Sequence, residues 1–331
     1  MSTFAAVVLF VGVLAYAVLG GADFGAGFWD LTAGGAERGR RPRHLIDETL
    51  APVWEANHVW LIFVLVMLWT AFPTAFAAIM TTLYVPLGLA ALGIVLRGSG
   101  FAFRKVMVRT DQQRFTGAAF AASSVLTPFF LGTVAGGIAS GRVPTGGNGD
   151  GLRSWVNPTS LLGGVLAVLT CAFVAAVFLT AEARRRDQAD LERWFRHRAL
   201  GAAVGTGAVA LAGIAVLHAD SPRLFDELLH RGLPLVIVSA LSGLASVALI
   251  GRAAPRLLQA LAVAAVAAII AGWGVAQYPY LLGTHLTIAD TAAPTPTLAA
   301  LTVVAAVALA LVVPSMGLLF VLSQRGQLQS H

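Results

Sequence analysis

Long apolar runs separated by short polar stretches recur along the whole chain. Each run holds about 20 residues, which is the length that a helix needs to cross a hydrocarbon core of roughly 30 Å. Nine transmembrane helices are predicted, at approximately residues 4–32, 48–72, 74–97, 115–138, 158–182, 199–218, 232–251, 256–278 and 297–322. The pattern therefore predicts an all-α polytopic membrane protein, with residues 1–331 forming a single transmembrane domain.

The composition agrees with this class of protein. Hydrophobic residues make up 57% of the 331 residues and charged residues only 11%, whereas a soluble domain carries roughly 25% charged residues. No basic segment precedes the first apolar run, so we expect a retained helix and not a cleaved signal peptide. Cys171, the single cysteine, lies inside an apolar run, which excludes a disulfide framework or a CxxC metal site within this chain.

Lys and Arg residues gather in short clusters between the apolar runs. Eighteen of the 22 lie after the first, third, fifth and seventh runs or in the C-terminal tail, and the other four lie on the opposite side. By the positive-inside rule, the N-terminus faces outward and the C-terminus faces the cytoplasm. The net charge of +6 is thus explained by topology, and no nucleic-acid partner is expected.

Two acidic residues, Asp23 and Glu55, fall well inside predicted helices. Asp23 lies in GADFGAGFWDL (21–31) and Glu55 in APVWEANHVWLIF (51–63). An acidic side chain at the centre of a membrane helix costs about 2.5–3.5 kcal/mol on insertion scales, so each needs a partner, a proton or water. Burial favours the protonated carboxyl group, which predicts that both acids exchange protons. The predicted topology places both roughly 10–15 Å from the cytoplasmic surface.

Glycines surround the first acid. Gly21 and Gly25 form a small-xxx-small pair around Asp23, and such pairs let a neighbouring helix approach closely. The sequence therefore predicts a helix contact at the depth of the carboxyl group.

Polar and aromatic side chains accompany the second acid. Trp54, Asn57 and His58 share one helix face, and Glu55 lies three residues before His58, within contact distance. A carboxyl group beside an imidazole and an amide can handle protons. Trp60 follows on the same helix.

Structural interpretations of these residues stay open. Asp23 can instead pair or cap at a helix contact, Glu55 and His58 can form a structural pair, and the tryptophans can serve as packing or interface aromatics. An intramembrane histidine is also a candidate haem ligand. The other histidines fall in loops, tails or helix edges, so we expect neither a metal site nor a redox cofactor in this chain.

Three motifs, GADFGAGFWDL, APVWEANHVWLI and FPTAFAAIMTTLYVPL, follow one another within residues 16–90. In order and spacing they resemble subunit II of cytochrome bd-type quinol oxidases. The resemblance implies two four-helix bundles plus one peripheral helix, with the first bundle in residues 1–138, a second bundle region in residues 158–278 and the last helix at 297–322.

The resemblance also implies a function. In that family, a haem-free subunit II pairs with a homologous, larger subunit I that holds haem b and haem d, oxidises quinol and reduces dioxygen to water in the bacterial cytoplasmic membrane. A small accessory subunit and bound membrane lipid stay open as further partners. The acids of the two motifs are associated with a cytoplasmic proton route to the haems, which implies that Asp23 and Glu55, with His58 beside them, belong to such a route.

Two other classes of protein compete with this interpretation. A proton-coupled secondary transporter would also bury acids, but we find neither an inverted repeat nor helices broken at matching places in two halves. A purely structural membrane scaffold would have no need of two buried acids.

Overall fold

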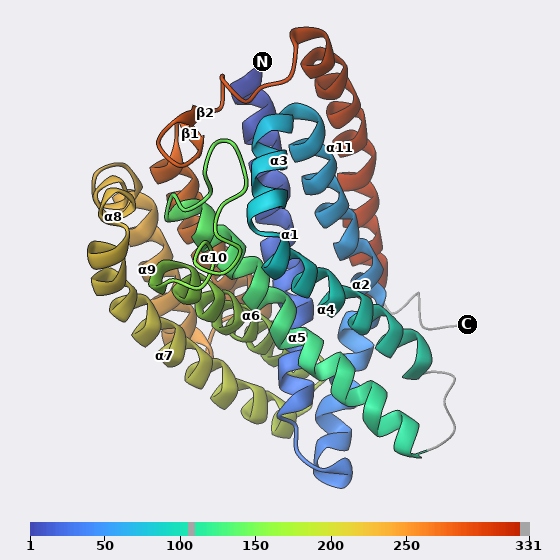
Figure 1. The fold of residues 1–331 in the computed structure, drawn as a ribbon. Coiled ribbons are helices and arrows are strands. Elements are labelled where there is room, and N and C mark those ends of the chain that lie inside the picture. Colours follow the sequence, from blue (N-terminus) through green and yellow to red (C-terminus); the bar gives the residue numbers. More distant parts are fainter. Residues whose placement is uncertain (105–109, 325–331) are drawn as a thin grey trace.

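The computed structural model describes the backbone of residues 1–104 and 110–324, and their side chains except at residues 36, 50–56, 101–104, 110–119, 121, 313, 316 and 319–324. Almost all of the described chain is helical (Figure 1). The elements are α1 (Ser2–Leu31), α2 (Ala36–Ala71), α3 (Pro73–Thr82), α4 (Tyr84–Arg104), α5 (Thr110–Ala139), α6 (Pro158–Arg185), α7 (Ala189–Asp220), α8 (Pro222–Glu227), the π-helical turn η1 (Leu228–Gly232), α9 (Leu233–Leu249), α10 (Pro255–Gln277), the short strands β1 (Tyr280–Leu282) and β2 (Leu286–Thr287), and α11 (Thr295–Gln324).

The predicted apolar runs lie in helices, but one of them is not a single helix. The run at 74–97 is divided between α3 and α4, and the segments Asn57–Ala71 and Pro73–Thr82 meet at an angle of 117°. Pro73 begins α3, where a residue without an N–H is tolerated at the first helical position. Seven helices in the described part are long and apolar enough to span a membrane, or eight if the bent pair is one span.

Helix α2 is also longer than the sequence predicted. It begins at Ala36 instead of residue 48 and has 36 residues, a length of about 54 Å at 1.5 Å per residue. A helix this long exceeds the hydrocarbon thickness, so we expect its first turns, which carry the arginines, to project beyond the apolar layer. Arg40, Arg41 and Arg43 lie on these turns.

Helix α1 runs through the middle of the bundle (Figure 1). It packs against α2, α5 and α6, and α6 in turn packs against α5, α7 and α10. The two halves of the chain therefore share one continuous helix interface along α1 and α6. In contrast, α7 and α9 leave large apolar side chains such as Leu211 and Leu244 exposed, as expected for helices that face lipid.

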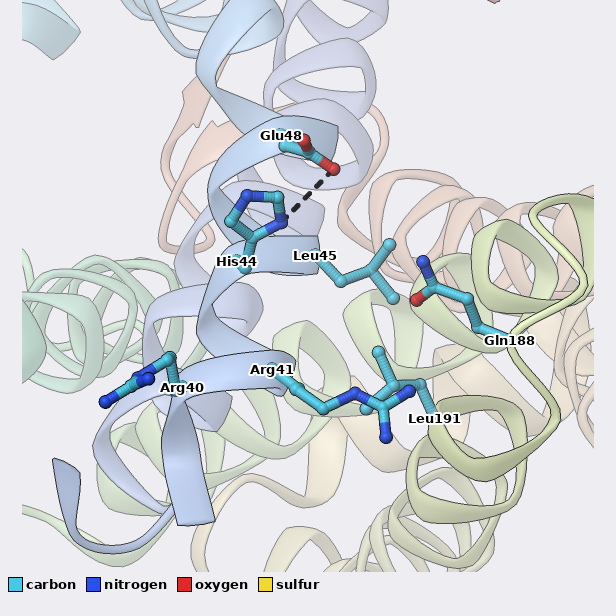
Figure 2. Close-up of a pocket in the computed structure, with 7 residues that line it drawn as sticks. All are labelled: Arg40, Arg41, His44, Leu45, Glu48, Gln188 and Leu191. Carbon is cyan, nitrogen blue, oxygen red and sulfur yellow. Dashed lines mark ion pairs between the residues drawn. The ribbon is translucent and has the colours of Figure 1, made fainter. Parts of the chain in front are cut away.

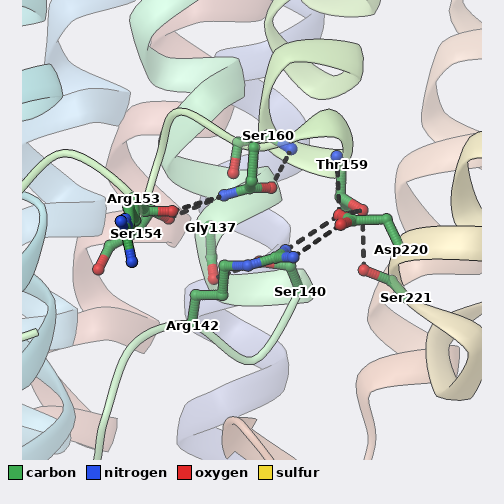
Figure 3. A network of polar contacts seen from close by, with 10 residues as sticks. Gly137, Ser140, Arg142, Arg153, Ser154, Thr159, Ser160, Asp220 and Ser221 are labelled. Atoms are coloured by element: carbon green, nitrogen blue, oxygen red, sulfur yellow. Dashed lines mark hydrogen bonds and ion pairs between the residues drawn. The ribbon is translucent and has the colours of Figure 1, made fainter. Parts of the chain in front are cut away.

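A network of hydrogen bonds joins three helix ends on one side of the bundle (Figure 3). Arg142 donates to both carboxylate oxygens of Asp220 at 3.0 and 2.7 Å, and the Thr159 hydroxyl donates to the same carboxylate at 2.6 Å. Asn157 caps α6 by accepting a hydrogen bond of 2.9 Å from the Ser160 amide. This network fixes the end of α7 against the start of α6.

Candidate functional site

The deepest charged contact of the described chain joins Asp23 on α1 to Arg97 on α4. Asp23 is 3% exposed and Arg97 is 1% exposed. Arg97 Nη2 donates to Asp23 Oδ1 at 2.6 Å and to the Asp23 backbone oxygen at 2.9 Å, and Nε donates to Oδ2 at 3.2 Å. The guanidinium thus holds both carboxylate oxygens, and each charge compensates the other.

Uncharged groups close the remaining sides of the Arg97 guanidinium. Its Nη1 donates to the Ser124 hydroxyl on α5. The ring of Phe120 lies 4.4 Å and that of Phe24 5.1 Å from the guanidinium carbon, so both rings face the cation. Five residues from α1, α4 and α5 therefore meet at one buried position.

Glycines on α1 allow this close packing. A Cβ atom at Gly27 would overlap the Ser124 hydroxyl, and one at Gly25 would overlap the carbonyl oxygen of Cys171 on α6. At Gly21 the same atom would lie 3.6 Å from the Cys171 sulfur, an ordinary contact. Gly25 is thus the point where α6 comes against α1, two residues along α1 from Asp23 and on a different face of the helix.

The location expected for Arg97 is wrong. Arg97 was counted among the topology charges after the third apolar run, whereas it is buried inside α4, which continues to Arg104. Asp30, near the end of α1, is also buried, at 6% exposure, and pairs with Arg43 at 2.7 Å. The sequence did contain a hint of the pair between Asp23 and Arg97. A buried carboxylate needs a cation, and Arg97 lies at the edge of an apolar run.

On α2, Asn57 lies against α1, and Trp60 is buried one turn further along. Asn57 is 2% exposed and donates from Nδ2 to the Leu19 carbonyl at 3.2 Å. Trp60 is 7% exposed and packs edge-to-face on Phe63. His58 is half-buried on the neighbouring face.

Two residues of the predicted cluster fall outside the described side chains. These are Trp54 and Glu55, so the predicted contact between Glu55 and His58 stays a prediction. The described residues bring Asp23 together with Arg97 and Ser124, neither of which the sequence analysis had assigned to the site.

A shallow hollow of about 230 Å³ lies between the start of α2 and the α6–α7 turn (Figure 2). His44 and Glu48 form an ion pair of 3.5 Å inside it. Arg40 pairs with Glu37 and Arg41 pairs with Asp190, all of them exposed. Because its charges are solvated and already paired, we place the candidate site at Asp23. The lining residues are Arg40, Arg41, His44, Leu45, Glu48, Gln188 and Leu191.

Within the part of the chain that the structure describes, no three His, Cys, Asp or Glu side chains gather in a way that could hold a metal ion. The buried pair uses one carboxylate and one guanidinium, and a guanidinium has no lone pair to offer a metal. Such an arrangement suits the stabilisation or transfer of charge inside the membrane.

Comparison with known proteins identifies the family. The family described as "Cytochrome bd terminal oxidase subunit II" matches residues 1–323. This chain belongs to that family. A solved structure of the bd oxidase from Geobacillus thermodenitrificans superimposes with a TM-score of 0.78 and 27% sequence identity, over 96% of this chain and 97% of that chain.

Two further relatives, both named as cytochrome bd oxidase subunit 2, align with shorter stretches of this chain. Cytochrome bd ubiquinol oxidase subunit 2 of Bacillus subtilis is 28% identical over 234 residues, which is 70% of this chain and 66% of that protein. Cytochrome bd-I ubiquinol oxidase subunit 2 of Escherichia coli K12 is 29% identical over 222 residues, 63% of this chain and 56% of that protein. The aligned stretches thus span less than two thirds of these relatives.

Proposed function

We propose that this chain is subunit II of a bd-type quinol oxidase in a bacterial cytoplasmic membrane. In this proposal it binds no haem itself and pairs with a homologous subunit I that holds haem b and haem d, oxidises quinol and reduces dioxygen to water. The observation that carries the proposal is the family match over residues 1–323. The similarity of the fold to a bd oxidase over 96% of the chain supports it.

The proposal includes the finer architecture. We place nine spans in the membrane by counting the region of α3 and α4 as one broken span, with the N-terminus outside and the C-terminus in the cytoplasm. The spans divide into a first four-helix bundle within 1–138, a second bundle region within 158–278 and a peripheral last helix. The Lys and Arg distribution supports the orientation even without the buried Arg97.

Asp23, with Glu55 and His58, carries protons from the cytoplasm toward the haems of the partner in this proposal. The geometry at Asp23 supports a specific atom. Oδ1 is held by Arg97 Nη2 at 2.6 Å, whereas Oδ2 accepts from Nε at the longer distance of 3.2 Å. We therefore propose Oδ2, the oxygen with the longer hydrogen bond, as the atom that takes part in the transfer, while Arg97 keeps the carboxyl group in place.

The test uses the intact complex purified through this chain. We expect a larger polypeptide to copurify and a reduced-minus-oxidised spectrum to show haem b and haem d. In that preparation, Asp23→Asn and Glu55→Gln should each lower oxygen consumption and proton uptake by about tenfold or more, since a positioned proton-transfer group contributes roughly 10²–10⁴-fold to a rate. Glu37→Gln, at an exposed acid, is the control and should match the unmodified complex.

Either of two results would contradict the proposal. A chain that purifies alone and without haem, from membranes containing the oxidase, would favour the transporter instead. Unchanged turnover in both acid variants would contradict the proton route, but it would not contradict the assignment of this chain as subunit II. The same preparation identifies any small accessory subunit or bound lipid.

A further inference from the structure

Three buried polar side-chain atoms of α1 and α2 have no hydrogen-bond partner among the described residues. They are the Tyr16 hydroxyl, the Asn57 side-chain oxygen and the Trp60 indole nitrogen. A buried polar group without a partner is unfavourable, because it has lost its hydrogen bonds to water. Native structures satisfy such groups, with ordered water where no protein atom is within reach.

The register of the two helices brings the three residues to one level. Asn57 bonds to the carbonyl of Leu19, and a Cβ atom at Gly12 would lie 3.1 Å from Val64 Cγ2. On α1, Tyr16 lies between Gly12 and Leu19. On α2, Trp60 lies between Asn57 and Val64. Because α1 and α2 run antiparallel, Tyr16 and Trp60 share the same depth, next to Asn57.

The ring of Tyr16 is directed along α1 toward the Asp23 end. A Cβ atom at Gly20 would lie 3.2 Å from Tyr16 Cε2, so the ring occupies the space that a side chain at Gly20 would fill. The ring also meets Phe24 edge-to-face, with centroids 6.5 Å apart. The hydroxyl therefore lies between the level of Trp60 and the Asp23 carboxylate.

We propose that an internal water molecule binds between Tyr16 Oη, Asn57 Oδ1 and Trp60 Nε1. The indole N–H can only donate and the amide oxygen can only accept, whereas the hydroxyl can do either. One water molecule satisfies all three, since it can accept from Trp60, donate to Asn57 and exchange a hydrogen bond with Tyr16. Internal waters typically make about three hydrogen bonds.

No neighbouring molecule can replace this water. The three atoms are covered by this chain itself, so a partner subunit or a lipid cannot reach them. The function of the site rests on the proposed proton route. In that route the water is the next polar group after Asp23. Tyr16 is a positioning residue, because its hydroxyl holds the water on the side that faces the Asp23 carboxylate.

The first measurement is a map of the intact complex at a resolution that shows ordered water. We expect density within about 3.2 Å of both the Tyr16 hydroxyl and the Asn57 oxygen. A Tyr16 hydroxyl bonded directly to a protein side chain, with no water between, would overturn the proposal.

The second measurement compares Tyr16→Phe with Tyr84→Phe, a matched loss of a hydroxyl from a tyrosine that is 61% exposed. Tyr16→Phe should lower oxygen consumption about fivefold, the effect of one lost hydrogen bond of about 1 kcal/mol. The solvent isotope effect on turnover should rise, while assembly and the haem spectrum stay unchanged. Tyr84→Phe should change none of these.

The outcomes separate the two proposals. If Asp23→Asn lowers turnover and Tyr16→Phe leaves both turnover and isotope effect unchanged, the link from the water to the route is wrong and the proposed function stands. If Asp23→Asn has no effect, the route through Asp23 fails, and the map alone decides the water site.

Discussion

At the scale of single residues, burial separates two kinds of ion pair that look alike in distance. Arg40 and Glu37 approach to 2.7 Å, but their side chains are 71% and 83% exposed. Arg97 and Asp23 approach to 2.6 Å with side chains that are 1% and 4% exposed. Exposed pairs contribute about 0–1 kcal/mol because water already solvates both charges. The loss of one partner from a buried pair instead leaves an uncompensated charge.

We therefore predict that Arg97→Gln destabilises the complex by about 3–5 kcal/mol. Arg40→Gln is the matched control and should change stability by no more than about 1 kcal/mol. The measurement is the apparent melting temperature of each purified complex in the same detergent.

A double variant sharpens this test. Asp23→Asn combined with Arg97→Gln leaves neither charge unpaired, so it should recover part of the stability lost in Arg97→Gln. Equal melting temperatures for Arg97→Gln and Arg40→Gln would show that the buried pair contributes no more to stability than the exposed pair.

At the scale of helices, the contact between α1 and α6 depends on the absence of a side chain. Gly25 faces the main chain of Cys171, and a backbone carbonyl cannot rotate away as a flexible side chain can. Gly88 on α4 is also helical, but a Cβ atom added there would meet nothing within 4 Å. The same substitution at the two positions therefore tests packing against helix propensity.

We predict that Gly25→Ala forces α1 and α6 apart and lowers stability by about 1–3 kcal/mol, the usual effect of overpacking a core. Gly88→Ala should be neutral or stabilising by up to about 1 kcal/mol, because alanine favours the helix. The yield of assembled complex and its melting temperature measure both effects. A Gly25→Ala complex as stable as Gly88→Ala would contradict the close contact.

At the scale of the whole molecule, the two ends of the bundle differ in charge and in cross-links. Arg184 near the end of α6 donates to Glu192 and to the carbonyls of Ile250 and Ala253, so it joins the α6–α7 turn to the α9–α10 turn. The Arg142 network joins helix ends at the other side. In the proposed orientation, the Arg184 side faces the cytoplasm.

We predict that a cysteine at residue 35 is labelled only from the cytoplasm and a cysteine at residue 146 only from outside. Gly35→Cys and Gly146→Cys are matched, since neither position has an atom within 4 Å of an added Cβ. The native Cys171 is buried, so background labelling should be low. A membrane-impermeant maleimide on intact and permeabilised cells gives the result, and the reverse pattern would invert the proposed orientation.

The sequence by itself determined that this chain is a bundle of apolar helices and that Asp23 is buried among glycines. Apolar runs of this length have few other stable arrangements in a membrane, because every backbone polar group must be satisfied within the run. The motifs around residues 16–90 also pointed to the family that the match over residues 1–323 then established.

Only the tertiary structure decided what each buried polar group contacts. Arg97 is 74 residues from Asp23 along the chain, and no local period links positions so far apart. The bend between α2 and α3 and the facing levels of Tyr16 and Trp60 depend in the same way on how helices pack. Periodicity describes one face of one helix, whereas a pairing partner is chosen by the neighbouring helix that comes against that face.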